Sequence, residues 1–196
     1  LNKTIEGMEN AARSMKQLAK SGKKIMFVAT KKQAREIVKK AAESVNMPYV
    51  TNRWLGGMMT NFTTIRKSVK KMQKIESMLN DKTLTAITKK EKLTLSREKA
   101  KLEKVLGGIE HLNRIPSAIF VVDITHEHLA VSEASKLGLK TFAMVDTNSN
   151  PLKVDYPIPA NDDASKSIEV ITNYLVAAIK EGLDERDQKE IEKEED

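Results

Sequence analysis

"KKIMFVATKKQAREIVKKAAESV", residues 23–45, contains the strand and the helix that decide the fold. The apolar run from Ile25 to Ala29 is continuous rather than alternating, which is typical of a parallel strand that is covered on both faces. After it, apolar residues recur at positions 34, 37, 38, 41, 42 and 45, which lie on one face of a helix. Thr30 and Gln33 have the spacing of a capping box, so we predict that they cap the start of this helix.

The same alternation continues on both sides of this segment. Helical spacing predicts helices over residues 4–20 and 127–137 and from about residue 163 to Gly182. Short apolar segments predict strands at 49–50, 117–123, 140–146 and 156–158. Strands that alternate with helices favour a parallel sheet with helices on both faces, so the fold class is α/β.

Residues 61–113 interrupt this alternation. Apolar residues recur there at steps of three and four, first at 62, 65, 69, 72, 75 and 79 and again at 95, 102, 106, 109 and 112, with a polar break over 80–92. The pattern predicts two long amphipathic helices that form an antiparallel hairpin and project from the sheet. We therefore divide the chain into a discontinuous α/β domain (1–60 and 114–182), a hairpin (61–113) and an acidic tail (183–196) that we expect to be disordered.

Composition excludes several classes of protein. The 196 residues include no cysteine, so a disulfide framework and a thiolate metal site are both excluded. No apolar run approaches the roughly 18 residues of a membrane span, and no signal-peptide pattern opens the chain. We expect a soluble, cytoplasmic protein without a membrane partner or a cofactor. The chain starts at Leu1 without a methionine, so we expect that its N-terminus has been trimmed.

Charge is distributed unevenly along the chain. Residues 1–60 hold 12 Lys and Arg against 4 Asp and Glu, and residues 61–113 hold 13 against 6. Residues 114–182 hold 6 against 9, and residues 183–196 hold 3 against 8. The first 113 residues therefore carry a net +15 and the remainder a net −8. A one-sided field of this size favours a polyanionic partner such as nucleic acid.

Many of these cations gather around the glycine pair Gly56-Gly57, where we expect the chain to turn out of the domain. A lysine-rich helix can also be no more than a solvated surface. That alternative does not explain why so many cations lie around the one glycine pair, Gly56-Gly57. The predicted RNA-binding residues are Lys31, Lys32, Arg35, Arg53, Trp54, Asn61, Arg66, Lys67, Lys70, Lys71 and Lys74.

Trp54 is the only tryptophan of the chain, and two roles remain open for it. It can pack where the hairpin leaves the domain, with Leu55, Met58 and Met59 as apolar neighbours. It can instead stack on an RNA base or contact a partner protein.

An α/β enzyme that acts on a phosphorylated substrate is the alternative function. Open α/β sheets bind ligands beyond the carboxyl ends of their strands, where Asp123, His126 and Asp146 lie in this chain. However, the sequence contains neither G-x-G-x-x-G nor a P-loop. His126 and His128 could bind a metal, but two ligands do not make a site, and orienting the loop or capping the next helix is the simpler role.

Several segments resemble the bacterial ribosomal protein S-two family of the small subunit. They are "FVATKKQAREIVKKAA" (27–42), "NRWLGGMMTNFTTIRKS" (52–68), "FVVDITHEHLAVSEASKLGL" (120–139) and "VDTNSNP" (145–151). The resemblance runs in order from Leu1 to about Gly182. In the family a glycine- and histidine-bearing segment precedes this region, so contacts made there cannot be transferred to this chain.

The resemblance implies a flavodoxin-like, three-layer α/β/α domain with an inserted antiparallel coiled-coil hairpin. It implies a structural, non-catalytic role in translation, as a constituent of the small ribosomal subunit that binds ribosomal RNA. It also implies neighbouring small-subunit proteins as partners, among them the large multi-domain messenger-binding protein.

Overall fold

The computed structural model describes residues 1–80 and 88–194. Within these residues, five strands form one parallel sheet in the order β2-β1-β3-β4-β5. The strands are β1 (Ile25–Val28), β2 (Tyr49–Val50), β3 (Ala118–Val122), β4 (Lys140–Val145) and β5 (Tyr156–Pro159). This strand order is that of flavodoxin-like folds, which confirms the predicted α/β class.

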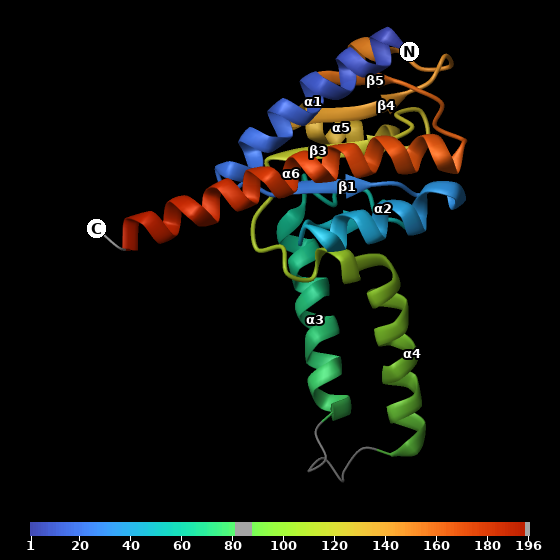
Figure 1. Ribbon diagram of the computed structural model, residues 1–196. Coiled ribbons are helices and arrows are strands. Elements are labelled where there is room, and N and C mark those ends of the chain that lie inside the picture. Colours follow the sequence, from blue (N-terminus) through green and yellow to red (C-terminus); the bar gives the residue numbers. More distant parts are fainter. Residues whose placement is uncertain (81–87, 195–196) are drawn as a thin grey trace.

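Helices cover both faces of the sheet and so make three layers (Figure 1). One face carries α1 (Asn2–Lys20), α2 (Lys32–Ser44) and α6 (Ser165–Glu194). The other face carries α5 (His128–Lys136), the segment 54–59 and the beginning of α3 (Phe62–Asn80). Among the described helices, none is long and apolar enough to cross a membrane.

The strands supply alternate residues to the two hydrophobic layers. Phe27 and Phe120 face α1, α2 and α6, and their rings meet edge to face with centroids 5.5 Å apart. Phe142 lies in the same layer and stacks on Tyr156 at 4.6 Å. Met26 and Ile119 point to the opposite layer. This burial on both faces explains the continuous apolar run of β1, because a strand of this kind has no solvent-facing side.

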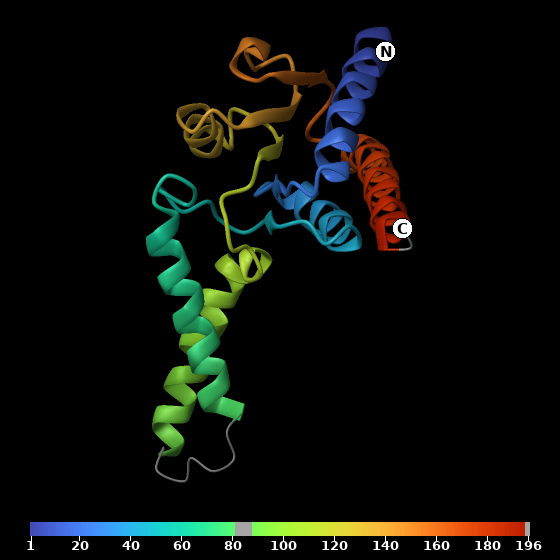
Figure 2. The same cartoon turned by 90° about the vertical axis from the view of Figure 1, so that its left-hand side faces the viewer.

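The segment 61–113 forms two helices that run side by side in opposite directions and project from the sheet (Figures 1 and 2). They are α3 and α4 (Lys89–Leu106), and a short 3-10 helix, η1 (Gly107–Ile109), follows α4. Ion pairs join them, with 2.5 Å from Lys71 Nζ to Glu98 Oε1 and 2.7 Å from Lys99 Nζ to Glu76 Oε1. The polar break predicted over 80–92 lies partly outside the described residues, since 81–87 are not described.

The start of α4 and the base of the hairpin are both well defined by side-chain contacts. Thr88 and Glu91 form a capping box, in which the Thr88 side chain accepts from the Glu91 N–H. At the base, Ile65, Val69, Leu106 and Ile109 belong to the same hydrophobic cluster as strand residues of β1 and β3. The base of the hairpin is therefore part of the core, whereas the distal part of each helix packs mainly on the other helix.

Two local predictions were wrong. The first is the capping box at α2, because α2 begins after Lys31 without a side-chain cap. The Thr30 hydroxyl instead donates to Glu127 Oε1, and the Thr30 N–H donates to the same oxygen at 2.7 Å. Because the Thr30 hydroxyl is bound by the buried Glu127 carboxylate, it does not cap α2.

The second wrong prediction is the disordered tail, because α6 continues through Gly182 to Glu194. Gly182 does not end the helix. It is buried at the closest approach of α1, where a Cβ atom would lie only 2.4 Å from the carbonyl oxygen of Lys16. One turn later, Glu185 accepts ion pairs from Lys16 and Lys20 at 2.9 and 2.6 Å. These contacts with α1 hold the first turn after Gly182 in place.

Candidate nucleic-acid interface

The segment 54–60 turns the chain from β2 into the hairpin, and its conformation is set by one carboxylate on α5. Glu133 Oε1 accepts from the Gly57 N–H at 2.7 Å, and Glu133 Oε2 accepts from the N–H groups of Met59 and Thr60, both at 2.9 Å. Gly57 adopts φ of +84°, which confirms that glycine permits the turn here. Glu133 was not recognised from the sequence, because its partners lie more than 70 residues away in the chain.

Trp54 packs into the core rather than standing on the surface. Its side chain belongs to the hydrophobic layer under α3 and α5, and only 7% of the residue is exposed. Its indole N–H donates to Glu133 Oε1 at 3.1 Å, so the polar end of the ring is also satisfied. Of the two roles left open by the sequence, packing is therefore the one that the structure supports, and the ring face is not available to a base.

The environment of Glu133 favours its charged form. Burial by itself raises the pKa of the carboxyl group, but hydrogen bonds from the N–H groups of Thr60 and Met59 and from Trp54 outweigh burial and lower the pKa below the usual 4.5. A buried carboxylate surrounded by donors is stabilised as the anion. The turn therefore depends on an ionised Glu133.

Lys31 follows the carboxyl end of β1 and is enclosed by carboxylates. Its ammonium contacts Asp123 Oδ2 at 2.6 Å, Asp162 Oδ1 at 2.8 Å and Asp163 Oδ1 at 2.8 Å. Burial alone would lower the pKa of Lys31, but these hydrogen bonds raise the pKa above its ordinary value. Asp123 also accepts from the N–H groups of Thr125 and His126, as a turn residue does.

This cluster occupies the carboxyl edge between β1 and β3, where flavodoxin-like folds usually bind their ligand. Here the single ammonium of Lys31 is bound by three carboxylates, so its positive charge is more than balanced. The ammonium of Lys31 therefore has no N–H left to donate to a phosphate. The same pairing occupies Asp123, which the enzymatic alternative requires as a site residue.

Two predicted RNA contacts bind the protein's own backbone. Arg35 donates from Nε to the Thr30 carbonyl at 2.8 Å. Arg66 donates to the Glu110 carbonyl and to Asn113 Oδ1, both at 3.0 Å, and so connects α3 with the segment after α4. Both side chains are half-buried. Their positions indicate that they hold the turn and the hairpin base in shape.

The remaining predicted residues are exposed. On α3, the buried residues Ile65, Val69, Met72 and Ile75 face the interior. The cations of α3 stand three and four positions apart, which places them together along one side of the helix. We call them the lysine stripe. It consists of Lys67, Lys70, Lys71 and Lys74, while Lys32, Arg53 and Asn61 are exposed elsewhere.

The second hairpin helix adds cations that the sequence analysis did not select. Lys99 is engaged by Glu76, but most of the others are exposed to solvent. The cations of α4 were not predicted as RNA contacts because they lie far along the chain from the glycine pair Gly56-Gly57, around which the predicted residues gather. The exposed cations of α4 are Lys89, Lys90, Lys92, Arg97, Lys101 and Lys104.

Comparison with known proteins decides the family. Residues 1–182 match the family described as Ribosomal protein S2. The chain belongs to this family. It is 56% identical over 186 residues to the small ribosomal subunit protein uS2 of Cytophaga hutchinsonii, and the alignment covers 95% of this chain and 73% of that protein. The protein of the same name in Bacteroides thetaiotaomicron is 55% identical over 194 residues, with 99% of this chain and 70% of that protein covered.

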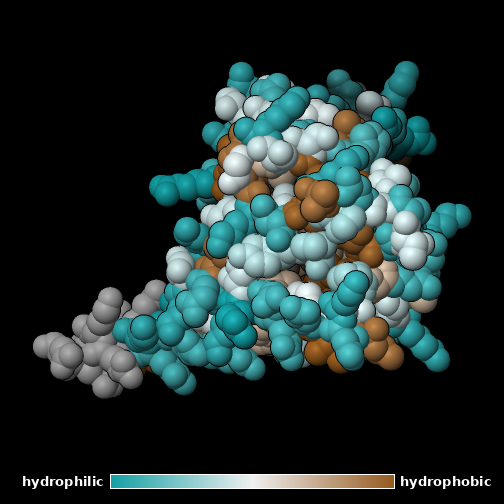
Figure 3. Space-filling view, turned by 90° about the horizontal axis from the view of Figure 1, so that it is seen from above, coloured by the Kyte–Doolittle hydropathy of each residue, from teal (hydrophilic) through white to brown (hydrophobic). Residues whose placement is uncertain are grey.

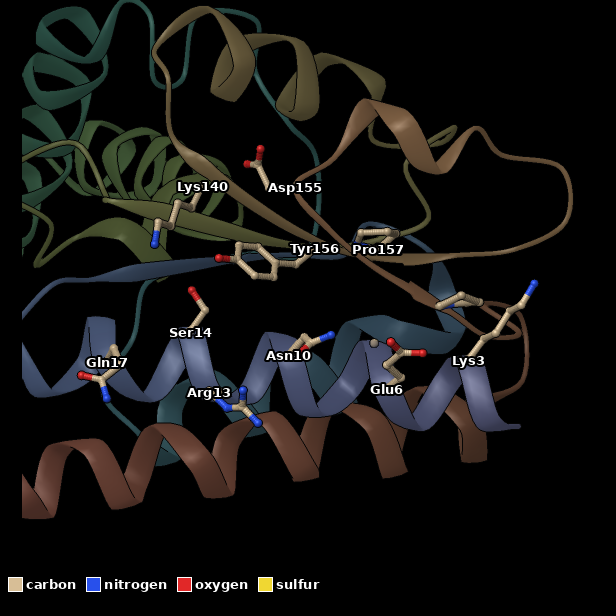
Figure 4. Close-up of a pocket in the computed structure, with 12 residues that line it drawn as sticks. Lys3, Glu6, Asn10, Arg13, Ser14, Gln17, Lys140, Asp155, Tyr156 and Pro157 are labelled. Atoms are coloured by element: carbon tan, nitrogen blue, oxygen red, sulfur yellow. The ribbon is translucent and has the colours of Figure 1, made fainter.

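The surface between α1 and β5 carries charges of both signs. A groove of about 660 Å³ lies between α1 and the edge strand β5, with Lys3, Glu6 and Arg13 along α1 and Lys140 opposite (Figure 4). Cations and anions alternate along this groove. In the view from above, the coloured part of α6 that extends from the body is hydrophilic (Figure 3).

The histidine pair lies where the loop after β3 leads into α5, with His126 in the loop and His128 as the first residue of the helix. The ring Nδ1 of His128 lies 3.3 Å from the Thr125 carbonyl oxygen, and the His126 N–H donates to Asp123. In the part of the chain that the structure describes, no group of three or more His, Cys, Asp or Glu side chains is placed to hold a metal ion. These contacts fit the role of orienting the loop before α5.

Proposed function

We propose that this chain is a structural constituent of the small ribosomal subunit and that it binds ribosomal RNA through the hairpin. Membership of the ribosomal protein S2 family supports the ribosomal role, and the relatives at 55–56% identity are named small ribosomal subunit proteins. The single observation that carries the mode of binding is the lysine stripe on a helix that projects from the body (Figure 2). Phosphates are the natural partners of such a stripe.

The hairpin carries more cations than anions, with 13 Lys and Arg against 6 Asp and Glu over residues 61–113. We propose that α3 and α4 pack as an antiparallel coiled coil, with Met72 and Ile75 in the seam and the interhelical ion pairs at its margins. The exposed cations then contact RNA phosphates, which position the protein without reading base sequence. Specificity comes from the shape of the folded RNA.

The site residues follow from this proposal. Arg53 and Asn61 lie near the start of the hairpin, and Lys32 lies at the start of α2. We propose these residues and the lysine stripe as RNA contacts. Lys31, Arg35 and Arg66 are proposed as internal supports, because their polar groups bind the protein itself. Trp54 is proposed as a packing residue.

The enzymatic alternative has no support from the comparisons, because the family is a structural ribosomal one. We propose the ribosome of the cytoplasm as the location, and neighbouring small-subunit proteins, including the large messenger-binding protein, as further partners. An adaptor that binds only proteins would make little use of the lysine stripe.

Co-sedimentation tests the proposed function. The native protein should sediment with small subunits through a high-salt sucrose cushion, and the charge-reversed variant Lys67→Glu/Lys70→Glu/Lys74→Glu should stay in the supernatant. A matched control is Lys3→Glu/Lys140→Glu/Lys166→Glu, which changes the same charge at exposed positions outside the hairpin. Equal sedimentation of both variants would contradict binding through the hairpin.

A further inference from the structure

A basic cavity lies at the amino edge of the sheet, away from the glycine pair. Since β2, β1 and β3 are parallel neighbours, the segments that precede them meet at this edge. These segments, residues 22–24, 46–49 and 107–117, line a cavity of about 730 Å³. We call this cavity the amino-edge pocket.

Cations outnumber free anions in this pocket. Lys23 and Arg114 are exposed in its lining and form no ion pair with any described residue. Lys24 donates to the Asn46 carbonyl at 2.8 Å, and its pKa is lowered by burial and by the nearby Arg186. Glu43, the carboxylate of the lining, already accepts the hydroxyl proton of Tyr49 at 2.7 Å.

The pocket has a fixed shape because its walls are tied to the hairpin base. Arg66 on α3 holds Glu110 and Asn113, which belong to the segment that forms one wall. Gly108 packs against Tyr49 so closely that a Cβ atom would lie 2.2 Å from the Tyr49 carbonyl oxygen. The cations of the pocket are therefore held on a rigid frame at the root of the hairpin.

The two edges of the sheet differ in their electrostatics. At the carboxyl edge, Lys31 is neutralised by Asp123, Asp162 and Asp163. At the amino edge, Lys23 and Arg114 lack such partners among the described residues. Cations that have no carboxylate partner favour an anionic ligand, and arginine can hold a phosphate through two parallel hydrogen bonds.

We propose that the amino-edge pocket is a second RNA-binding site, in which Lys23 and Arg114 hold backbone phosphates at the root of the hairpin. The proposal rests on the proposed function, since the RNA is that of the small subunit. It adds a contact surface that lies on the body of the protein and not on the hairpin helices. Two separated contacts would fix the direction of the hairpin on the RNA, which one contact alone would leave free to pivot.

Binding of purified small-subunit ribosomal RNA to the full chain tests the proposal by filter retention. The pocket variant is Lys23→Glu/Arg114→Glu, and the matched control is Lys3→Glu/Lys166→Glu, whose exposed residues lie towards the carboxyl edge. The pocket variant should bind at least about tenfold more weakly, and its slope of log K against log salt should be smaller by about two, because two phosphate contacts are lost. Circular dichroism should show equal folding of both variants.

The outcomes separate the pocket from the proposed function. If wild-type and pocket variant bind equally and with equal slopes, the pocket proposal fails while the hairpin remains. If wild-type protein does not bind the RNA at all, the proposed function fails and the pocket proposal fails with it. A Lys23→Arg variant should bind like wild-type, because charge and reach are kept.

Cross-linking identifies the class of partner. The chain has no cysteine, so a single introduced thiol carries a photoreactive group at one place only. Ile115→Cys places it in the pocket and Leu129→Cys places it at the start of α5, where the native residues are 41% and 47% exposed. In assembled small subunits, Ile115→Cys should cross-link to RNA and Leu129→Cys should not. A cross-link from Ile115→Cys to protein alone would overturn the proposal.

Discussion

Glu133 determines the conformation of the turn that leads into the hairpin, because it accepts hydrogen bonds from four residues of that turn. Oε1 accepts hydrogen bonds from the Gly57 N–H and the Trp54 indole N–H. Oε2 accepts hydrogen bonds from the N–H groups of Met59 and Thr60 and from the Thr60 hydroxyl. A neutral side chain of the same size cannot accept all of these bonds. Glu133 therefore holds the segment that leads into the hairpin in its conformation.

Glu133→Gln should destabilise the protein, because the amide NH₂ would face donors instead of accepting from them. Each buried donor that is left without an acceptor lowers the unfolding free energy by roughly 1–3 kcal/mol. The fluorescence of Trp54, the only tryptophan, should shift to the red as its surroundings loosen. Chemical denaturation followed by this signal measures both effects. The exposed Glu9→Gln is the control, and an equal effect of the two substitutions would contradict the role of Glu133.

Acid should remove the contribution of Glu133. Its pKa in the folded state lies below 4.5, so its stabilisation is fully present above pH 4.5 and is lost as the pH falls through the folded-state pKa. The difference in unfolding free energy between wild-type and Glu133→Gln should therefore shrink below pH 4.5. Denaturant titrations at successive pH values measure it, and a difference that stays constant down to pH 2 would contradict this cause.

Arg53 and Trp54 are neighbours with separable roles. Arg53→Ala should leave the thermal melt nearly unchanged, because the side chain is exposed, but it should weaken association with small subunits. Trp54→Ala should cost about 3–5 kcal/mol of unfolding free energy, as for other buried aromatic residues. Melting curves and sedimentation of both variants test the separation. An Arg53→Ala protein that associates normally would remove Arg53 from the interface.

At the scale of elements, the hairpin has a base in the core and a distal part that packs on itself. Replacement of residues 75–96 by a short turn should therefore preserve a cooperative melt, because Ile65, Val69, Leu106 and Ile109 remain. RNA binding should weaken, because the distal cations are lost. Removal of 63–111 is the contrasting variant and should lose the cooperative melt. If the shorter deletion also unfolds the protein, the distal part contributes to the core.

The end of α6 is a second element whose contribution can be measured. Truncation after Gly182 removes Glu185, whose pKa is lowered to about 2 by hydrogen bonds from Lys20 and Lys16. This truncation should lower the melting temperature at pH 7, whereas truncation after Asp187 should not. The difference should shrink as the pH falls from about 4.5 towards 2, because the stabilisation by Glu185 is lost as the pH approaches its folded-state pKa of about 2. Equal melting of both truncations at pH 7 would show that the contact with α1 does not stabilise the fold.

Helices and strands were predictable where the hydrophobic pattern that specifies them lies within the element itself. The apolar runs of β1 and β3 and the spacing along α3 predict the strands and helices, since burial on the sheet imposes those patterns. The prediction of a disordered tail after Gly182 was wrong because a glycine at a helix end and a glycine at a helix crossing look alike in sequence. The decisive contact, with Lys16, comes from a distant part of the chain.

At the scale of the whole molecule, the site was less predictable than the fold. The surplus of positive charge is visible in the sequence, but which cations remain free depends on partners that only folding brings together. Lys31 meets Asp123 and Asp162 from more than 90 residues away, and this pairing removes Lys31 from the residues that we propose as RNA contacts. Among the exposed cations of α3 and α4, Lys71 pairs with Glu98, and no ion pair with a described residue is found for the others.

The salt dependence of RNA binding tests the electrostatic basis of the proposed function most directly. If about six phosphates are neutralised, the affinity of the full chain for purified small-subunit ribosomal RNA should fall on the order of a thousandfold between roughly 50 and 200 mM salt. The slope of log K against log salt should then be about −4 to −5. A slope near zero, with binding retained at high salt, would contradict a phosphate-binding role for this chain.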